Sequence, residues 1–461
     1  MAKRTGSKVL LLSYFFPPAG GVSVQRMLAL TKYLPRDRCE VGVLTTWNGA
    51  YPVSDPALLK RIPPDVKIHR AFTPELPYQL RRQLWEKLNG GAAKNTLAGA
   101  PVKNEVVAAP PLDAGEAGPN VLVRAKTALR DSIRRALLPD PQVVWRPFAE
   151  RAAARLIQEE GYDTVLVTAP PFSSFCIGNA LKRRFPHITL VSDFRDDWFG
   201  FYLNGVDSMA SEEKRQNAVE IEKETVELSD LVVAVTDATR DDIRARYPAQ
   251  PESKFQVIPN GYDPEAVPKV PPAQTRSDRM VITYVGTVYK PCSPRYFLDA
   301  LDQVQDEIRG KIEVRFVGRV IDEEKHFLEN RKAQLTQTGF VAQDVALRNM
   351  AESDYLLLVI DDPQTLSGKL FEYLATGKPI LALTPPDSES AKLVRKVKSG
   401  VICQPRDLEA IGKMIVEAYQ RFVAGQHPVQ PEWEQIRGFE RPRLADRYLS
   451  LMAAARPAER R

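Results

Sequence analysis

The sequence predicts an α/β protein with two doubly wound parallel sheets, each covered by helices on both faces. Short apolar runs rich in Val, Ile and Leu recur along the chain, and segments with helical spacing separate them. Near-continuous hydrophobic strands that alternate with helices are typical of parallel sheets with two buried faces. The runs form two sets, so we expect two domains of this kind.

The expected strands follow one another in order along each half of the chain. The first set comprises Val9–Ser13, Val41–Thr45, Thr164–Thr168, Thr189–Asp193 and Leu231–Thr236. The second set comprises Val281–Val285, Ile312–Val317, Tyr355–Ile360, Pro379–Thr384 and Gly400–Gln404.

The break between the two sets is expected at Tyr262–Met280, where four prolines favour an extended and semi-stiff connection. We therefore expect an N-terminal domain over residues 1–262 and a C-terminal domain over residues 263–432. Residues 433–461 have a helical pattern, and we expect them to pack back on the first domain.

Residues 75–149 are expected to form an insertion in the first domain. Residues 90–120 are rich in Gly, Ala and Pro, which indicates a flexible segment. The segment over residues 122–138 is amphipathic. Its apolar positions are Leu122, Ala125, Leu129, Ile133 and Leu137, and its basic positions are Arg124, Lys126, Arg130, Arg134 and Arg135. Such a helix can lie on an anionic bilayer, gaining about 1 kcal/mol per basic residue near the surface. The alternative is a helix packed on the core with a solvated basic face.

Composition argues against several classes of protein. The net charge of +6 is modest, and the sequence has no zinc-finger spacing, so nucleic acid is not an expected partner. The 4 histidines are scattered, so neither a metal nor a cofactor is expected. No apolar stretch approaches the roughly 18 residues of a spanning helix. The 4 separated cysteines favour free thiols in a reducing cytoplasm. We expect a cytoplasmic protein, or one peripheral to the inner face of the membrane.

Residues 366–384 contain the most informative pattern. They predict a short helix that begins after Ser367, a favourable N-cap, and ends at Gly377. Pro379 prevents the helix from continuing, and a buried strand follows.

The start of this helix carries chemistry. The first N–H groups of a helix have no partner within it, and the N-terminus carries a partial positive charge. Gly368 and Lys369 therefore lie where a phosphate would bind. Glu372 lies one turn further on, where its carboxylate can accept hydrogen bonds from sugar hydroxyls. The alternative is an ordinary α/β helix that happens to begin with Ser-Gly-Lys.

Two further loops follow expected strands and can approach a phosphate. Gly20 and Gly21 precede a helix and let the backbone come close to a ligand. Lys290 follows the strand Val281–Val285 and can meet a diphosphate as a point charge. The alternatives are a tight strand-to-helix connection and a solvent-exposed lysine.

The segment V-S-D-F-R-D-D-W places Asp193, Arg195 and Asp196 at a strand end. A carboxylate at this position can orient or deprotonate an acceptor hydroxyl. The alternative is an Arg–Asp pair that holds the loop.

Taken together, these segments resemble the retaining GT-B glycosyltransferases of the glycosyltransferase family 4 group. The motifs are, in order, V-L-L-L-S-Y-F-F-P-P-A-G-G, D-F-R-D-D-W, V-I-P-N-G-Y-D, I-T-Y-V-G-T and S-G-K-L-F-E-Y-L-A-T-G-K-P-I. The resemblance covers nearly the whole chain. It implies two Rossmann-like domains that face a cleft, with a C-terminal helix that crosses back.

The resemblance implies a metal-independent enzyme that moves a sugar from a nucleotide-sugar donor to an acceptor hydroxyl, with retention at the anomeric carbon. The donor would bind mostly to the second domain and the acceptor to the first. The acceptor would be a glycan or lipid-linked glycan of cell-surface biosynthesis. The expected donor-binding residues are Gly20, Gly21, Lys290, Ser367, Gly368, Lys369 and Glu372, and the expected catalytic residues are Asp193, Arg195 and Asp196.

Three positions depart from the family pattern. Gln364 replaces a frequent glutamate, Thr287 replaces a frequent arginine, and the loop at Asp193 lacks the family's histidine. These departures favour the alternative of a non-catalytic GT-B scaffold that binds a nucleotide or a partner. A sugar-nucleotide epimerase is a second alternative on the same fold.

Overall fold

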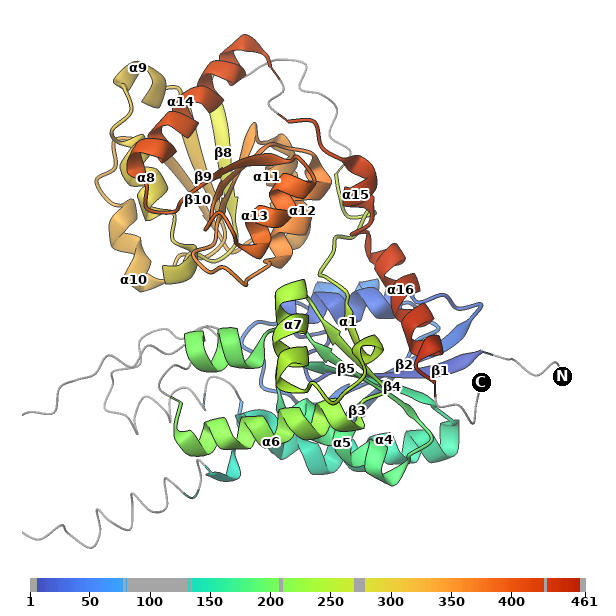
Figure 1. Ribbon diagram of the computed structural model, residues 1–461. Helices are drawn as coiled ribbons and strands as arrows, with labels where there is room; N and C mark the ends of the chain where they lie inside the picture. Colours follow the sequence, from blue (N-terminus) through green and yellow to red (C-terminus); the bar gives the residue numbers. More distant parts are fainter. Residues whose placement is uncertain are drawn as a thin grey trace, which may run out of the picture. The chain divides into compact units, whose positions relative to one another are not determined.

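The computed structural model describes residues 6–77, 80, 132, 135–206, 210–268, 278–426 and 429–456. The chain divides into two compact units, one formed by Met1–Ile258 with Ala445–Arg461 and the other by Pro259–Leu444. The first contains a 7-stranded sheet and the second a 6-stranded sheet (Figure 1). All the paired strands run parallel, which confirms the prediction of an α/β protein with two doubly wound sheets.

The sheet of the first unit has the order β3-β2-β1-β4-β5-β6-β7. Its strands are β1 (Ser7–Leu12), β2 (Cys39–Thr46), β3 (Lys67–Ala71), β4 (Thr164–Ala169), β5 (Thr189–Phe194), β6 (Leu231–Ala234) and β7 (Phe255–Val257). Its main helices are α1 (Val22–Tyr33), α4 (Arg146–Arg155), α5 (Ser173–Arg184), α6 (Glu212–Leu228) and α7 (Asp237–Arg246). Helices α4, α5 and α6 cover one face of the sheet, and α1 and α7 cover the other (Figure 1).

The sheet of the second unit has the order β10-β9-β8-β11-β12-β13. Its strands are β8 (Met280–Val285), β9 (Ile312–Val317), β10 (Gln334–Gly339), β11 (Tyr355–Val359), β12 (Ile380–Leu383) and β13 (Gly400–Cys403). Its helices are α8 (Arg295–Leu301), α9 (Asp306–Arg309), α10 (Asp322–Lys325), α11 (Gln343–Glu352), α12 (Gly368–Thr376), α13 (Glu389–Lys396), α14 (Leu408–Ala424) and α15 (Trp433–Arg437).

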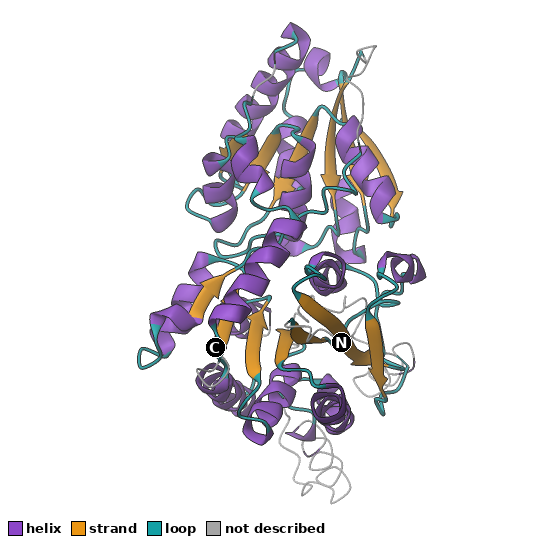
Figure 2. Ribbon diagram, turned by 90° about the vertical axis from the view of Figure 1, so that its right-hand side faces the viewer, coloured by secondary structure: helices purple, strands orange, loops and turns teal. Residues whose placement is uncertain are grey.

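Alternation along the strands explains how this sheet is buried on both faces. Tyr355 and Leu357 of β11 belong to the core under α8 and α14, whereas Leu356 and Leu358 belong to the core under α11, α12 and α13. Successive side chains of a strand point to opposite faces, so a continuous apolar run serves both cores. Figure 2 shows helices packed along the strands of each sheet.

The last helix, α16 (Arg441–Ala454), runs from the second unit into the first, because the units divide between Leu444 and Ala445. The sequence placed the start of the returning tail at residue 433. In the structure, α15 still belongs to the second unit, and only the residues from Ala445 onward belong to the first.

Three strands were absent from the sequence prediction: β3, β7 and β10. β3 and β10 lie at sheet edges and are rich in polar residues, as in Q-L-T-Q-T-G, and β7 has only 3 residues. Edge strands have one unpaired side and need no continuous apolar run, so hydrophobic periodicity misses them.

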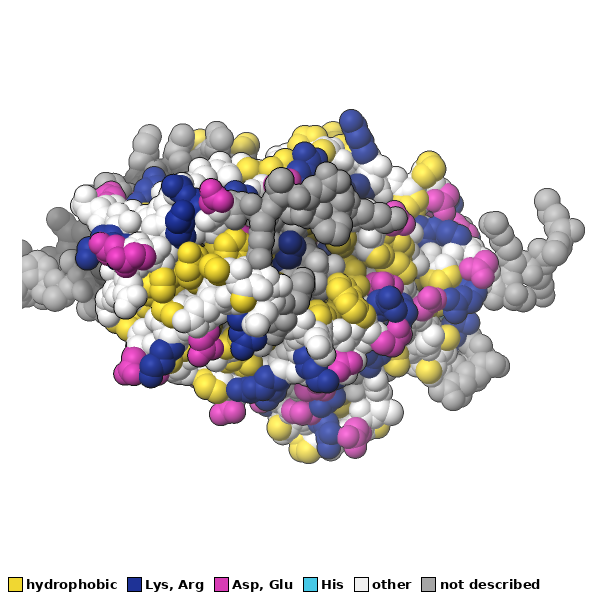
Figure 3. Space-filling model, turned by 90° about the horizontal axis from the view of Figure 1, so that it is seen from above, with side chains coloured by type: hydrophobic (Ala, Val, Ile, Leu, Met, Phe, Trp, Pro, Cys, Tyr) yellow, Lys and Arg dark blue, Asp and Glu magenta, His cyan; other side chains and the backbone are white. Residues whose placement is uncertain are grey.

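The amphipathic segment lies mostly outside the described residues, and the proposal that it binds a membrane stays a prediction. Among the described helices, none is both long and apolar enough to cross a bilayer. On the face drawn in Figure 3, basic and acidic side chains are interspersed, in keeping with the modest net charge of +6.

Candidate functional site

The most favourable ligand position in the second unit is the switch point between β8 and β11. The chain winds from β8 toward β10 on one side and from β11 toward β13 on the other. The register between β8 and β11 ends at Thr283 and Leu356. Beyond it, the Tyr373 hydroxyl accepts a hydrogen bond from the N–H of Val285 at 2.8 Å and donates to the carbonyl of Leu357 at 3.2 Å. Open α/β sheets bind ligands where neighbouring strands diverge in this way.

Helix α12 begins at this switch point, with Ser367 in the N-cap position. The Ser367 side chain makes no capping hydrogen bond, and its carbonyl accepts from the N–H of Leu370 at 3.1 Å. Within the part of the chain that the structure describes, the N–H groups of Gly368 and Lys369 have no hydrogen-bond partner. The start of α12 therefore presents amide donors, a hydroxyl and a lysine from consecutive residues. Together these groups can bind an anion.

Lys369 is held in place by an aromatic ring. Its Nζ donates to the hydroxyl of Tyr284 at 3.1 Å and lies 4.3 Å from the centroid of that ring. Tyr284 is buried, and its hydroxyl lies 2.9 Å from the carbonyl oxygen of Thr287. Burial lowers the pKa of the Lys369 ammonium because the charged form loses solvation. A bound anion would compensate the solvation that the ammonium lost on burial. Lys369 is therefore positioned to bind a phosphate.

Glycines end the three strands on one side of the switch point. Gly286 follows β8 with φ of 120°, Gly318 follows β9 with φ of 138°, and Gly339 is the last residue of β10 with φ of 69°. A Cβ on Gly318 would lie 2.3 Å from the carbonyl oxygen of Gly286, which is not sterically possible. A Cβ on Gly286 would lie 3.7 Å from the Nζ of Lys369. The end of β8 is therefore bare backbone beside the lysine, and a ligand can approach it closely.

Glu372 lies one turn into α12 and is partly buried. Its Oε1 accepts a hydrogen bond from the Nε2 of Gln343 at 2.7 Å. Gln343 is the first residue of α11, so the two helices fix the carboxylate. Lys290 lies in the loop after β8 and is exposed.

Sequence reasoning missed three residues of this region. Gln343 orients Glu372. Arg319 follows Gly318, is exposed, and has no ion pair with any residue that the structure describes. Phe340 follows Gly339 and exposes 64% of its surface. The sequence pattern that could have indicated Arg319 and Phe340 is a strand followed by a glycine and then by a large side chain. For Phe340 this pattern was missed because β10 was not predicted as a strand.

In the first unit, the two glycines of the loop after β1 differ. Gly20 is buried and donates its N–H to the carbonyl of Val53 at 2.9 Å. A Cβ there would lie 3.0 Å from the Val53 Cγ1, so Gly20 serves packing rather than ligand contact. Gly21 is exposed with φ of 91°, precedes α1, and has open space where a Cβ would be. Of the two, only Gly21 can offer its backbone to a ligand.

Asp193 cannot act as an exposed catalytic acid or base, because its relative exposure is 0%. The Nη2 of Arg26 donates to its Oδ1 at 2.9 Å, and the Nε of Arg26 donates to its Oδ2 at 3.1 Å. Thr168 donates to Oδ2 at 2.9 Å, and Tyr448 of α16 donates to Oδ1 at 2.7 Å. The predicted role is corrected to a structural one, and the salt-bridge partner is Arg26 of α1 rather than Arg195.

Arg195 is also buried and is used within the fold. Its guanidinium donates to the carbonyl of Ser23 in α1 and, at 2.8 Å, to the carbonyl of Pro170 after β4. It joins the two segments that flank the switch point of the first sheet, between β1 and β4. This makes Arg195 a residue that positions loops, not one that contacts substrate.

Asp196 is the remaining carboxylate and differs from both neighbours. It is partly exposed, and its carboxylate makes no hydrogen bond to any described residue. Burial raises the pKa of Asp196, and the charge of Arg195 opposes that shift. Of the three predicted catalytic residues, Asp196 is the one whose side chain is partly exposed.

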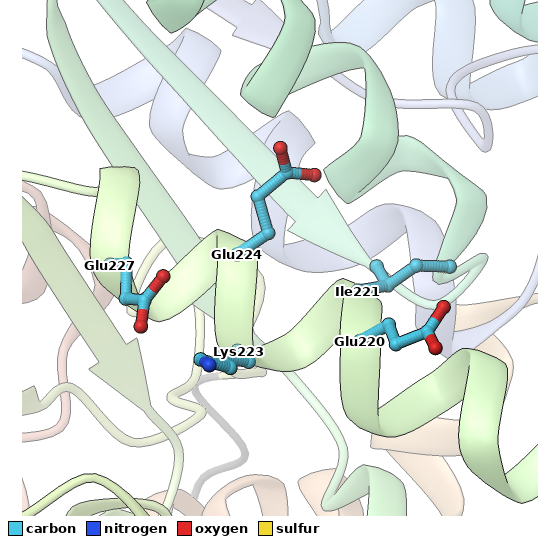
Figure 4. Close-up of a pocket in the computed structure, with 5 residues that line it drawn as sticks. All are labelled: Glu220, Ile221, Lys223, Glu224 and Glu227. Carbon is cyan, nitrogen blue, oxygen red and sulfur yellow. The ribbon is translucent and has the colours of Figure 1, made fainter.

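Within the described ranges, no group of three or more His, Cys, Asp or Glu side chains is placed to hold a metal ion. Figure 4 shows a hollow elsewhere on the first unit, lined by Glu220, Ile221, Lys223, Glu224 and Glu227 of α6. Its three glutamates would repel a phosphate, so it does not compete with α12 as an anion site.

Comparison with known families gives two matches that together span most of the chain. Residues 97–266 match the model of Glycosyltransferase Family 4. Residues 279–421 match the model of Glycosyl transferases group 1. A search of curated proteins gave no match.

Solved structures share the fold at low sequence identity. The structure of HepE from Anabaena in complex with UDP and glucose has a TM-score of 0.60 and 14% identity, and the match covers 97% of this chain and 100% of that chain. A glycosyltransferase from Rickettsia africae has a TM-score of 0.57 and 12% identity, with 98% and 99% covered. WaaG, a glycosyltransferase involved in lipopolysaccharide biosynthesis, has a TM-score of 0.54 and 14% identity, with 97% and 98% covered. This protein therefore belongs to the GT-B glycosyltransferases, with a family 4 domain followed by a group 1 domain.

Proposed function

We propose that this protein transfers a sugar from a nucleotide-sugar donor to an acceptor hydroxyl, with retention of the anomeric configuration. The observation that carries the proposal is the start of α12, where two amides without a partner among the described residues and the desolvated Lys369 lie at the switch point. A diphosphate supplies the charge and the acceptors that this position lacks.

The rest of the donor is assigned to neighbouring groups of the second unit. Glu372, held by Gln343, would accept hydrogen bonds from the ribose hydroxyls. Lys290 and Arg319 would add positive charge around the diphosphate, and Phe340 offers an exposed ring to the base. HepE, which was crystallised with UDP and glucose, supports a donor of this type.

The reaction needs a stabilised leaving group. The bond between the anomeric carbon and the diphosphate oxygen breaks, and a bond from that carbon to the acceptor oxygen forms. The acceptor proton passes to the departing diphosphate on the same face, which accounts for retention. Fixed amides and the Lys369 ammonium stabilise the developing negative charge without reorganising, and no step of this scheme requires a metal ion.

Acceptor binding is assigned to the first unit. Asp196 would orient the acceptor hydroxyl, because its carboxylate is partly exposed and makes no hydrogen bond to a described residue. Gly21 would let the backbone of the loop after β1 approach a substrate. The likeness to WaaG favours an acceptor glycan of cell-surface biosynthesis, free or lipid-linked. An anionic membrane surface remains a proposed partner on the basis of the basic segment after residue 121.

The test is turnover with a panel of UDP-, GDP- and ADP-sugars, with release of nucleoside diphosphate as the signal. We expect slow donor hydrolysis without acceptor, and at least about a hundredfold loss of turnover in Lys369→Met, as for the removal of one charge-stabilising group. Glu372→Gln should instead weaken donor binding, because the neutral amide is a poorer acceptor for the ribose hydroxyls. Lys413→Met on α14 is the matched control, since Lys413 is exposed and pairs only locally with Glu409.

The alternatives predict other results. Isomerised donor would support an epimerase, and nucleotide binding without any chemistry would support a non-catalytic scaffold. Full activity of both Lys369→Met and Glu372→Gln would refute the assignment of the donor site.

A further inference from the structure

Two exposed aromatic rings stand side by side at the carboxyl end of the first sheet. Trp47 follows β2 and exposes 69% of its surface, and Phe72 follows β3 and exposes 43%. The two strands are register neighbours up to Thr46 and Ala71, and the N–H of Trp47 donates to the carbonyl of Ala71 at 2.8 Å. The ring centroids are 6.4 Å apart with an interplanar angle of 58°. We call this pair the aromatic ledge.

Hydrogen bonds fix the loops that carry the aromatic ledge. The side chain of Asn48 donates to the carbonyl of Thr73 at 2.8 Å and accepts from the N–H of Thr73 at 2.9 Å. This reciprocal pair ties the residue after Trp47 to the residue after Phe72. The Phe72 ring also packs edge-to-face on Phe148 of α4, with centroids 5.3 Å apart. The two rings are therefore held in solvent by a preorganised support, although burial would stabilise them.

The surroundings of the aromatic ledge are polar and balanced in charge. Arg70 donates to the carbonyls of Thr46 and Pro17, both at 3.0 Å. On the other side of Phe72, Glu75 accepts from the hydroxyl of Tyr14 at 2.7 Å. Among the described residues, one fixed cation and one fixed anion next to Phe72 in sequence do not make the basic surround that attracts an anionic bilayer.

We infer that the aromatic ledge is a subsite for a sugar ring of the acceptor. This rests on the proposed function. A pyranose has an apolar C–H face, which stacks on an indole or phenyl ring, and equatorial hydroxyls, which need polar partners at the rim. Rigid aromatic rings bordered by hydrogen-bonding side chains offer both. The ends of β2 and β3 also lie at the same carboxyl edge of the sheet as the switch point between β1 and β4, where open α/β sheets bind ligands.

The experiment compares variants on an array of several hundred immobilised bacterial and model glycans. Trp47→Ala and Phe72→Ala remove one ring each, and Trp47→Phe keeps an aromatic ring. Val219→Ala on α6 is the matched control, because Val219 is an apolar side chain of the same unit with 43% exposure. Nucleoside diphosphate binding by the same variants is measured by thermal shift with UDP, GDP and ADP.

We expect the intact protein to bind a set of glycans, and both alanine variants to lose about tenfold or more in apparent affinity, as for an aromatic contact. Trp47→Phe should recover part of the loss and Val219→Ala should lose nothing. Nucleotide shifts should be unchanged in all four variants, which separates this inference from the donor assignment.

Three results would overturn the inference: glycan binding that is equal in Trp47→Ala and the intact protein, the absence of any bound glycan, or a Trp47-dependent flotation with anionic liposomes in place of glycan binding. Failure of the proposed function would instead appear as the absence of a thermal shift with any nucleotide in the intact protein.

Discussion

Asp193→Asn is expected to destabilise the first unit, because Asp193 holds a buried positive charge. The Nε and Nη2 of Arg26 donate to its carboxylate, and Thr168 and Tyr448 donate to the same two oxygens. Arg26 also donates to the carbonyl of Ile258 at 2.7 Å. The network thus joins α1, β5 and α16 near the positions where the chain leaves and re-enters the first unit.

The expected magnitudes follow from burial. Asparagine removes the carboxylate charge that faces the buried Arg26 guanidinium, which costs about 3–5 kcal/mol. Tyr448→Phe removes two hydrogen bonds to charged groups, because the hydroxyl donates to Asp193 and accepts from the Nη2 of Arg26, and it should cost at least about 1.5–3 kcal/mol. The two changes share partners, so the double variant should lose less than the sum of the single losses.

The assay is urea unfolding followed by tryptophan fluorescence, since Trp145 and Trp198 are buried in the first unit. Asp237→Asn is the control: its ion pair with Arg240 leaves the aspartate 68% exposed, and we expect a loss of at most about 1 kcal/mol. A stability change below about 1 kcal/mol in Asp193→Asn, together with a large loss of turnover, would refute the structural role and favour the catalytic one.

Three further predictions concern the candidate site and the thiols. Gly318→Ala should abolish nucleotide binding and destabilise the second unit by at least about 1–3 kcal/mol, because the new Cβ would lie 2.3 Å from the Gly286 carbonyl oxygen. The control is Gly412→Ala, where a Cβ has open space. If denaturation and nucleotide thermal shift show that both variants are tolerated, the close approach of Gly318 to Gly286 is contradicted. Nucleoside diphosphate affinity should fall as the pH rises through the lowered pKa of Lys369, earlier than for an ordinary lysine, because the diphosphate binds the ammonium form. Calorimetry across this alkaline range should show no such fall in Lys369→Met. The 4 cysteines are buried, and burial raises the pKa of Cys176 to about 11. A thiol reagent should therefore titrate 4 thiols after denaturation and react only slowly with the native protein. Rapid reaction of the native protein would contradict the burial of these thiols.

The two-sheet fold was readable from the sequence because a parallel strand buried on both faces is apolar throughout. The runs at Ile312–Val317 and Thr164–Thr168 match β9 and most of β4. The exposed edge strands β3 and β10 carry no such signal. The helix between Ser367 and Gly377 was also predictable, since Gly377 has the left-handed conformation that its place after the last turn requires, with φ of 68°.

The site was only partly readable, because a side chain's role depends on contacts with distant residues. Asp193 and Asp196 look alike in sequence, but Arg26 lies 167 positions from Asp193 and buries its charge. Tyr448 is 255 positions away. The support of Lys369 by Tyr284, 85 positions away, left no local pattern either. Residue type and strand position predicted the candidates, and only packing separated structural from accessible groups.

Calorimetric titration with UDP, GDP and ADP tests the central claim most directly, using the intact protein, Lys369→Met, Glu372→Gln and the control Lys413→Met. We expect at least one nucleotide to bind the intact protein and the control equally, with Lys369→Met weaker by about tenfold or more, as for the loss of a charge-assisted hydrogen bond. Equal affinity of Lys369→Met and the intact protein would contradict the claim that the start of α12 binds the diphosphate.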